Sequence, residues 1–456
     1  MAVFGRPRRQ LMAALLLAAS TAFAEGPPVS YVQGNLGTTG FLDGEGIRLR
    51  SPDERGILVG GVMIWPSFVL EGRYDTNLFQ EEDSLEPSAV PVIRIMPGVA
   101  VSNANPANLA WEVAVAADGR IYATGNETIF SLSNAGVLAD AKAVILPNGV
   151  FSVSLLESFR RVVSAQNVET SDSYNRNANR IGARFEIKPG GGALKTYFGY
   201  DFILNRFDDF DRGDYLSHDV VAGVRWRFYP KTEAFIDGTF SIWDWSRETS
   251  ADGQRVDHMP LRVQGGLNGY LTKRLTLLAK AGYGNSLHGE GPSYNNVIGH
   301  AEVGYAPSAS MLFAAGFTRD YQSSFYGNYY VENRTYLRGQ FRFLRQFGVD
   351  LSAGYHHIQF AEFDPIASDP GAASDGNYTV VSHKERTDHQ VSGHVRFDVS
   401  FSRWLAMSVG YEARAVFSDF ELLNHVDGGV SAPDLDFVDK VAYVRHQVYA
   451  SLNFQY

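Results

Sequence analysis

The 456-residue sequence contains no cysteine. Disulfide frameworks, thiolate metal sites and lipid attachment through cysteine are therefore excluded. Long apolar runs are also missing, because no stretch approaches the roughly 18 apolar residues of a membrane-spanning helix. Basic residues are in deficit, with 40 Lys and Arg against 50 Asp and Glu, so we do not expect this acidic chain to bind nucleic acid.

The N-terminus has the pattern of an export signal. Three arginines precede an apolar run, Leu11 to Ala19, that is too short to be a stable membrane anchor. Ala22-Phe23-Ala24 then supplies the small residues of a cleavage site. We therefore predict that residues 1–24 are a signal peptide and that the mature chain begins near Glu25. A short membrane anchor is the alternative.

Glycine and aromatic residues are abundant, with 45 Gly, 30 Phe and 23 Tyr, although the mean hydropathy is only −0.16. Aromatic and glycine enrichment with two-residue alternation is typical of a transmembrane β-barrel. We predict three parts: the signal peptide, a periplasmic N-terminal extension over 25–61 and an outer-membrane β-barrel over 62–456. The extension is either a flexible lead-in or a partial plug.

The clearest strand is the last one, Ala442 to Tyr456. Its even positions are mainly apolar and its odd positions mainly polar, so one face of the strand is apolar. The same pattern recurs over Val220–Phe228, Leu261–Leu271, Leu337–Phe343 and Gln390–Phe401. A soluble β-sandwich also alternates, but its strands usually have about 5–6 residues, and most of these are longer.

Short turns alternate with longer polar connections along the chain. The predicted turns are Asn103–Asn108, Pro147–Gly149, Pro189–Gly192, Pro230-Lys231, Thr272–Arg274, Ala306–Ser308, Arg345-Gln346 and Ser402-Arg403. The predicted loops lie near 76–88, 125–129, 166–178, 205–216, 246–258, 286–295, 322–330, 363–386 and 418–438. These connections join about 18 strands, the even number that bacterial barrels require. Alternation is weak over 130–145, which leaves sixteen strands as an alternative.

The fold class follows from these patterns. We predict an all-β, transmembrane, antiparallel up-and-down barrel, because closure leaves no unpaired strand edge in lipid. At about 18 strands the interior is wide enough for an aqueous channel. Short turns face the periplasm in such barrels, so the long loops should face the cell exterior.

Two stretches resemble a known family. Glu71-Gly72-Arg73-Tyr74-Asp75-Thr76-Asn77-Leu78-Phe79 resembles the opening motif of outer-membrane proteins of the β-barrel porin 2 type. Asn179-Arg180-Ile181-Gly182, followed by Lys188 to Leu194, resembles a hairpin of myxobacterial barrel proteins. Some relatives of this type serve capsule and exopolysaccharide export, so the resemblance implies a pore for secreted polysaccharide and a polysaccharide-export complex as a partner. It carries over no substrate residue.

If the apolar faces meet lipid, the opposite faces line the interior. The charged candidates for the pore lining are Arg225, Arg227, Arg262, Arg338, Arg342, Arg396, Arg414, Arg445, Asp237, Asp350, Asp398 and Glu412. Rings of Arg or Lys favour anions in pores, and the planar guanidinium suits carboxylates and phosphates. The alternative is that these groups are paired wall charges that maintain the barrel shape.

Enzymatic and metal sites are not indicated. His300 and Glu302 share one face, but no nucleophile elbow or metal-binding helix motif accompanies them. Acidic loop residues such as Asp208, Asp364 and Asp419 could hold divalent cations, although their spacing does not match an EF-hand. We therefore predict no catalytic residue, no cofactor and no metal.

The C-terminus carries an expected insertion signal. Leu452, Phe454 and Tyr456 lie on one face of the last strand and resemble the signal read by the barrel-assembly machinery. Outer-membrane lipid and that machinery are the expected partners. The predicted function is an outer-membrane pore for passive passage of a hydrophilic solute or polymer, with secreted polysaccharide favoured. A general porin for small solutes and a non-conducting structural or assembly barrel are the alternatives.

Overall fold

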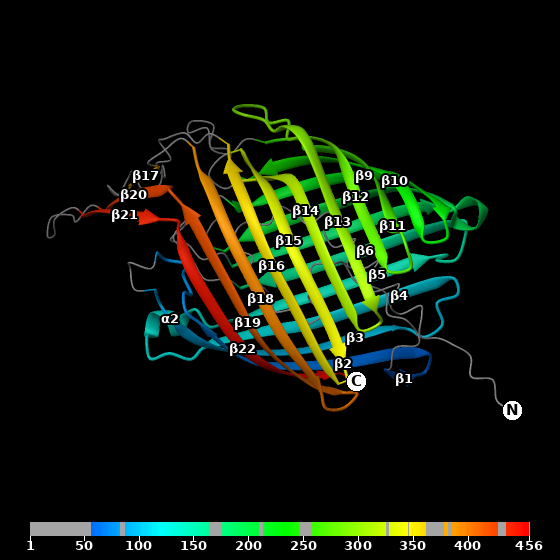
Figure 1. Cartoon of the computed structure of the whole chain (residues 1–456), viewed down its shortest axis with the longest axis horizontal. Helices are drawn as coiled ribbons and strands as arrows, with labels where there is room; N and C mark the ends of the chain where they lie inside the picture. Colours follow the sequence, from blue (N-terminus) through cyan, green and yellow to red (C-terminus); the bar gives the residue numbers. More distant parts are fainter. Residues whose placement is uncertain are drawn as a thin grey trace.

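The computed structural model is a closed antiparallel β-barrel (Figure 1). The structure describes residues 56–82, 87–163, 175–208, 213–246, 257–324, 328–344, 346–361, 378–381, 385–426 and 435–455. The predicted signal peptide and most of the predicted extension lie outside the described residues. Their boundaries therefore stay predictions.

Eighteen strands form the barrel wall, as predicted from the alternation of turns and loops. They are β2 (Val62–Asp75), β3 (Val90–Asn103), β4 (Leu109–Tyr122), β5 (Asn134–Ile145), β6 (Phe151–Val162), β7 (Arg176–Ile187), β8 (Leu194–Phe207), β9 (Tyr215–Tyr229), β10 (Thr232–Trp245), β11 (Leu261–Tyr270), β12 (Leu275–Asn285), β13 (Asn295–Ser308), β14 (Met311–Ser323), β15 (Tyr329–Phe343), β16 (Phe347–Phe360), β18 (Thr387–Ser400), β19 (Leu405–Ser418) and β22 (Tyr443–Gln455). Each strand pairs with its neighbours along the chain, and β2 pairs with β22 to close the ring. Sixteen strands is therefore wrong.

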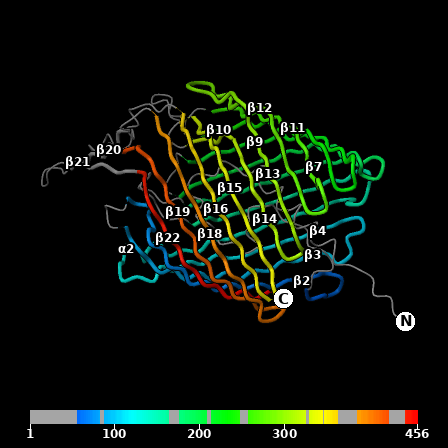
Figure 2. Tube along the Cα trace, in the orientation of Figure 1, coloured from blue at the N-terminus to red at the C-terminus, as the bar shows by residue number. Residues whose placement is uncertain are grey.

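Among the described residues, four further strands lie outside this ring. β1 (Ile57–Val59) forms a tight hairpin with the start of β2, within the segment predicted to be an extension. β17 (Tyr378–Val381), β20 (Glu421–Val426) and β21 (Leu435–Lys440) form a small separate sheet. Figure 1 shows β20 and β21 at one end of the barrel, and the C-terminus toward the other. The tube in Figure 2 follows the strands around the wall.

The described turns agree with the predicted ones except at one site, and Arg345 of the predicted turn Arg345-Gln346 lies outside the described residues. The predicted turn Ala306–Ser308 is wrong, because β13 continues to Ser308 and meets Met311 directly. Pro307 is tolerated inside the strand because the pairing register shifts between Tyr305 and Ser308, where a missing N–H breaks no regular ladder.

Loop 125–129 contains a short helix that the sequence did not predict. α2 (Glu127–Ser131) begins at Asn126, whose side chain accepts hydrogen bonds from the backbone N–H groups of Thr128 and Ile129. Ile129 packs into a small buried cluster with Leu78, Val90, Val92 and Tyr122. The helix therefore covers the wall beside β3 and β4 at the loop end. β5 follows, so the weakly alternating stretch does contain a strand.

The two faces of the wall differ in chemistry. Ile236, Leu337 and Trp226 point outward and are 63%, 59% and 58% exposed. The adjacent residues Phe235 and Tyr336, which point inward, are 6% and 3% exposed. The alternation in the sequence thus places large apolar side chains on the outer face and leaves the inner face to polar and aromatic side chains.

Among the described residues, no helix is long and apolar enough to cross a membrane.

Candidate functional site

All twelve predicted lining residues occupy inner-face positions of the barrel strands. They alternate with exposed apolar residues, as Arg225 and Arg227 do with Val224, Trp226 and Phe228 on β9. The inner wall is therefore the candidate functional site. Most of its charged groups make ion pairs, and these fall into separate clusters.

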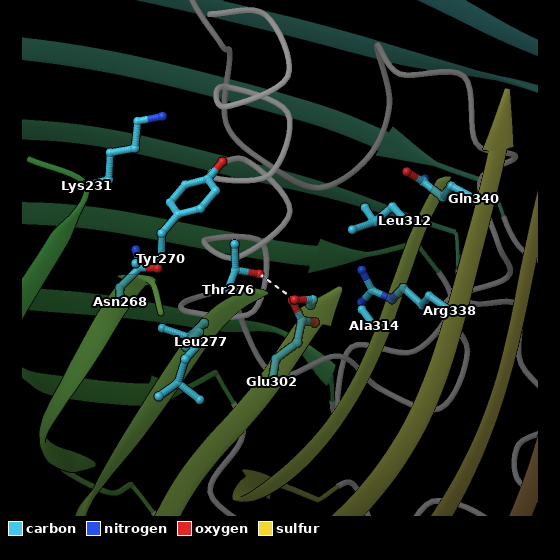
Figure 3. Close-up of a pocket in the computed structure, with 13 residues that line it drawn as sticks. Lys231, Asn268, Tyr270, Thr276, Leu277, Glu302, Leu312, Ala314, Arg338 and Gln340 are labelled. Atoms are coloured by element: carbon cyan, nitrogen blue, oxygen red, sulfur yellow. Dashed lines mark hydrogen bonds between the residues drawn. The ribbon is translucent and has the colours of Figure 1, made fainter. Parts of the chain in front are cut away.

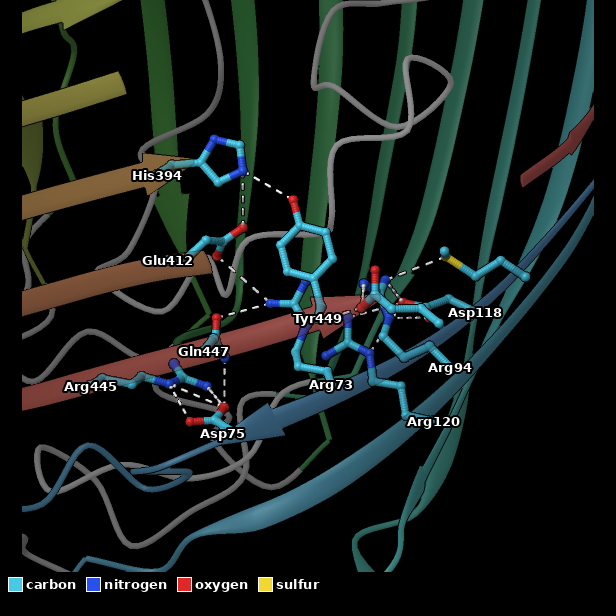
Figure 4. Close-up of polar contacts among 12 residues, drawn as sticks. Arg73, Asp75, Arg94, Asp118, Arg120, His394, Glu412, Arg445, Gln447 and Tyr449 are labelled. Atoms are coloured by element: carbon cyan, nitrogen blue, oxygen red, sulfur yellow. Dashed lines mark hydrogen bonds and ion pairs between the residues drawn. The ribbon is translucent and has the colours of Figure 1, made fainter. Parts of the chain in front are cut away.

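The first cluster lies on β2, β3 and β4 (Figure 4). Arg73 Nε lies 3.0 Å from Glu71 Oε1. Arg94 lies between two acids, 3.4 Å from Glu71 and 3.0 Å from Asp118. Arg120 also pairs with Asp118, at 2.9 Å. Because Glu71, Arg94 and Asp118 are each no more than 4% exposed, this chain of alternating charges is a buried part of the wall.

The second cluster crosses the closure between the first and last barrel strands. Arg445 on β22 donates from Nε to Asp75 Oδ1 on β2 at 2.9 Å. Gln447 also donates to Asp75, at 2.6 Å, and accepts from Arg73 at 2.9 Å. Asn77 donates to the backbone carbonyl of Val444 at 3.2 Å. These contacts add side-chain bonds to the β2–β22 ladder.

Glu412 extends this network toward β18. It lies 3.7 Å from Arg73 Nη1 and 4.0 Å from His394 Nε2. His394 is hydrogen-bonded to the hydroxyl of Tyr449 at 3.0 Å, and the Arg73 guanidinium lies 4.9 Å from the centre of the Tyr449 ring. Figure 4 shows these side chains converging from β2, β18, β19 and β22 on the inner face.

Asp350 on β16 joins two of the predicted arginines. Arg396 lies 2.6 Å from Asp350, and Arg342 lies 3.2 Å from the same carboxylate oxygen. Arg396 also contacts Asp398, at 3.3 Å. The Arg342 side chain is 50% exposed, so this cluster reaches the solvent inside the barrel.

A similar cluster lies on β9 and β10. Arg225 lies 3.2 Å from Glu233 and 3.3 Å from Asp237. Tyr197 on β8 donates its hydroxyl to Asp237. On β7 and β8, Arg180 and Arg184 share Asp201 in the same way, at 2.7 and 2.8 Å.

The inner face of β11 to β15 carries a small cavity of about 60 Å³, large enough for water rather than for a solute (Figure 3). Lys231, Tyr270, Glu302, Arg338 and Gln340 contribute to its lining. The Arg338 guanidinium lies 4.8 Å from the centre of the Tyr336 ring, and Tyr336 donates its hydroxyl to Glu302. This part of the wall combines a cationic group with hydrogen-bonding aromatic residues.

Two predicted residues have different surroundings. Arg262 faces the inner side of β11 and contacts the end of β14, with its Nε 3.3 Å from Asp320. Arg414 faces inward between Ser392 and Arg445, its register partners on the two neighbouring strands.

His300 and Glu302 contact different partners. His300 Nδ1 is hydrogen-bonded to Thr318 Oγ1 at 2.7 Å, whereas Glu302 contacts Tyr336. Within the described residues there is no cluster of three or more His, Asp or Glu that could hold a metal ion. Among the loop acids, Asp208 forms an ion pair with Arg161 at 2.5 Å, and this hydrogen bond lowers the pKa of Asp208. Asp364 lies outside the described residues.

Two of the three predicted insertion residues are described. Leu452 is 37% exposed on the outer face. Phe454 lies on the same face, with its ring centre 6.0 Å from that of Phe68 and 6.2 Å from that of Trp404. Tyr456 lies outside the described residues.

The candidate list missed the charged residues of the first barrel strands, namely Arg73, Asp75, Arg94, Asp118 and Arg120, of which all but Arg120 are buried. A signal was present, because Glu71, Arg73 and Asp75 alternate on β2 and so share one face. The resemblance of this stretch to a family motif does not reveal how its charges pair on the inner face.

No protein-family model matches the chain, and no curated protein matches it in sequence. Solved structures do resemble it. OccK3 (OpdO) of Pseudomonas aeruginosa has 11% identity and a TM-score of 0.45, and the match covers 86% of this chain and 95% of that one. OccAB4 of Acinetobacter baumannii has 9% identity and a TM-score of 0.44 over 89% and 100%. The outer-membrane protein OpdK of P. aeruginosa has 11% identity and a TM-score of 0.47 over 86% and 99%.

These likenesses are too distant to indicate an activity or a substrate for this chain. The comparisons do not support the predicted polysaccharide-export type, which rests on two short sequence motifs.

Proposed function

We propose that this chain is an outer-membrane channel for the passive passage of small hydrophilic solutes. The observation that carries the proposal is the two-faced wall: a closed barrel with exposed apolar side chains outside and charged pairs inside. Soluble monomers rarely expose contiguous apolar patches larger than a few hundred Å². A belt of apolar side chains around a barrel fits a bilayer.

The charged inner face supports a hydrated interior. Arg342 is 50% exposed and Lys195 is 36% exposed, although both make ion pairs. Water at such groups avoids the desolvation that makes buried charge expensive. On the outer face at the bilayer midplane, an Arg or Lys would cost roughly 2–4 kcal/mol. The distribution of charge therefore favours a water-filled barrel in lipid.

The expected selectivity is a modest preference for anions. Arg342 and Arg396 share one carboxylate, and Arg180 and Arg184 share another. The Arg180–Arg184 cluster has two cationic groups and one acid, which favours anions. In the Arg342–Arg396 cluster, Asp398 balances the second cation. Because many other wall charges are fully paired, the preference should be weak.

The predicted passage of polysaccharide gains no support from the described wall. None of the contacts described above distinguishes a polymer from a small solute. The general channel is therefore the function that the geometry supports best.

Recording the purified full-length chain in planar lipid bilayers tests the proposal. We expect stepwise conductance, with a reversal potential under a salt gradient that indicates weak anion preference. A correctly folded barrel that shows no conductance would contradict the channel and favour a scaffold.

A further inference from the structure

The barrel wall divides at the loop end between β13 and β14. The β12–β13 ladder continues to the pair Asn285–Asn295, and the β14–β15 ladder continues to Ser323–Tyr329. The β13–β14 ladder, by contrast, ends at the pair Gly299–Arg319. Residues 295–298 at the loop end of β13 and residues 320–323 at the loop end of β14 are therefore not paired with each other in this ladder. They belong to two separate hairpin ends.

The end of the β14–β15 hairpin lies against the inner face of β12 and β13. Ile298 faces inward and is 0% exposed, whereas the adjacent Val297 is 58% exposed outside. Tyr321 on β14 packs against Ile298 in a buried cluster with Tyr294 and Val331. A Cβ atom on Gly284 would lie 2.7 Å from the Tyr321 ring, so the missing side chain at Gly284 leaves the room for this ring.

Arg262 joins this hairpin end to β11. Its Nη2 donates to the Tyr321 carbonyl oxygen at 2.7 Å, and its Nε contacts Asp320 at 3.3 Å. The guanidinium also lies 4.1 Å from the centre of the Tyr321 ring. The Tyr321 hydroxyl donates to the backbone carbonyls of Asn285 and Leu261, at 2.9 and 3.3 Å.

Further contacts come from two loops. His258 Nε2 is hydrogen-bonded to Ser323 Oγ at 2.9 Å. Asn328 donates to the carbonyls of Glu290 and Pro292, at 2.8 and 2.9 Å. The contacts described here between the hairpin end and β11–β13 all involve side chains, and no described ladder joins the two.

The register of the β13–β14 ladder indicates a second arrangement available to the hairpin end. Continuing the β13–β14 register beyond Gly299–Arg319 would pair Asn296 with Gln322 and Asn295 with Ser323. In that arrangement Tyr321 would share the outer face with Phe317, which is 45% exposed, because the two residues are four positions apart on one strand. The hairpin end would then complete the wall instead of lying inside it.

We propose that residues 320–323 and 328–331 form an inward-folded gate of the channel, latched by Arg262. The gate rests on the proposed function, because it regulates conduction through the barrel. The folded-in arrangement narrows the loop-end mouth, and completing the β13–β14 ladder widens it. Exchange between these two packings is the kind of two-state change on which gating depends.

Changing Arg262 to Gln removes the ion pair to Asp320 and should shift the hairpin outward. We expect the population of the wide state to rise about tenfold, which corresponds to about 1.4 kcal/mol, and the mean conductance to rise with it. The matched control is Arg161→Gln, which breaks the ion pair to Asp208 at the loop end of β6, a strand that pairs with β5 and β7 and does not border the hairpin. That control should conduct like the unchanged chain.

The absence of native cysteine allows a direct test of the second arrangement. In the double variant Asn296→Cys/Gln322→Cys, a disulfide forms only when the ladder is completed, and neither residue belongs to the latch. We expect slow crosslinking in this variant, faster crosslinking when Arg262→Gln is added, and high conductance once the pair is oxidised.

The outcomes separate the gate from the channel. If the unchanged chain conducts but neither crosslinking nor conductance responds to Arg262→Gln, the gate is refuted and the channel stands. If the unchanged chain does not conduct, the channel fails, while crosslinking still reports whether the hairpin moves. Should Arg262→Gln assemble poorly, the cysteine pair in the otherwise unchanged chain decides, and an absence of crosslinking there refutes the gate.

Discussion

Arg445 on the last barrel strand donates from Nε to Asp75 on the first at 2.9 Å. Asp75 is 2% exposed, so the pair is shielded from water. The β2–β22 ladder extends from the pair Ser67–Gln455 to Asp75–Gln447. The ion pair therefore lies at the loop end of this ladder, where the barrel closes.

Changing Asp75 to Asn should destabilise the barrel strongly, because it leaves Arg445 buried without its acid. Removing one partner of a buried pair costs about 3–5 kcal/mol in unfolding free energy. The folded fraction after stepwise heating, measured from gel mobility, gives the loss of thermal stability. Arg161→Gln, which breaks a more exposed pair, should cost about 0–1 kcal/mol. Equal effects of the two changes would contradict a special role for the closure pair.

Changing Arg338 and Arg342 to Glu should reduce or reverse the anion preference. Both residues lie on the inner face of β15, and the Arg342 side chain is 50% exposed. Reversal potentials at low and high salt measure the effect, which should weaken as salt screens the charges. The control is Arg161→Glu, which makes the same change of charge as each of these substitutions but at an outer-face position. It should leave the ion selectivity unaltered. An unchanged reversal potential in the inner-face variant would show that these arginines do not act on permeating ions.

Deleting Leu452 to Tyr456 should block insertion into the outer membrane. Leu452 and Phe454 present apolar groups on the outer face, and the β22 ladders to β2 and β19 include both residues. The amount of folded protein in outer-membrane fractions measures insertion. Phe454→Ala should reduce this amount, whereas Gln455→Ala, on the other face, should not. Normal outer-membrane levels of the truncated chain would refute an insertion signal at these residues.

The loop end should face the cell exterior. A membrane-impermeant thiol reagent can test this without background labelling, because the chain contains no cysteine. One single-cysteine variant is Glu290→Cys, in the loop between β12 and β13. The other is Lys231→Cys, in the short turn between β9 and β10. We expect intact cells to label only the first, and disrupted cells to label both. The opposite pattern would mean that the barrel is inverted.

Acidification should weaken the packing of the loop between β12 and β13. Burial lowers the pKa of His288 to about 4 from its ordinary value of 6.5. The neutral ring is therefore favoured in the folded chain, so its contribution to stability is present above pH 6.5 and is lost as the pH falls toward 4. His288 stacks on His258, with ring centres 4.5 Å apart, and its Nδ1 is hydrogen-bonded to Ser286 at 2.8 Å.

Thermal midpoints of the unchanged chain and of His288→Gln, compared between pH 7 and pH 4, check this expectation. The variant should lose less stability on acidification than the unchanged chain does. Identical losses would show that His288 does not contribute to the pH dependence.

The strand pattern could be predicted from the sequence because side chains alternate faces with a period of two. The short helix α2 could not be predicted because five residues give too little periodicity. Asn126 followed by Glu127 is nevertheless a recognisable helix N-terminus. The turn near Pro307 was misplaced because proline usually ends a strand, and only the irregular pairing there accommodates it.

The inner-face position of the charged candidates follows from the same alternation, but their partners do not. Asp350 and Arg396 lie on different strands, and only the register places them 2.6 Å apart. The displacement of Arg262 into a hairpin contact depends on where the β13–β14 ladder ends, which no local pattern reveals.

The closure between β2 and β22 also constrains the order in which the barrel can assemble. Asp75 and Arg445 are separated by 370 residues, so their contact is among the most distant in the chain. Contacts of such long sequence separation form slowly, because the intervening chain must lose its freedom first. A ribosome has released β2 long before β22 exists, so the first strand keeps an unpaired edge until synthesis ends. The architecture therefore requires that the chain is exported before it folds, and that the unpaired edge of β2 is protected during export.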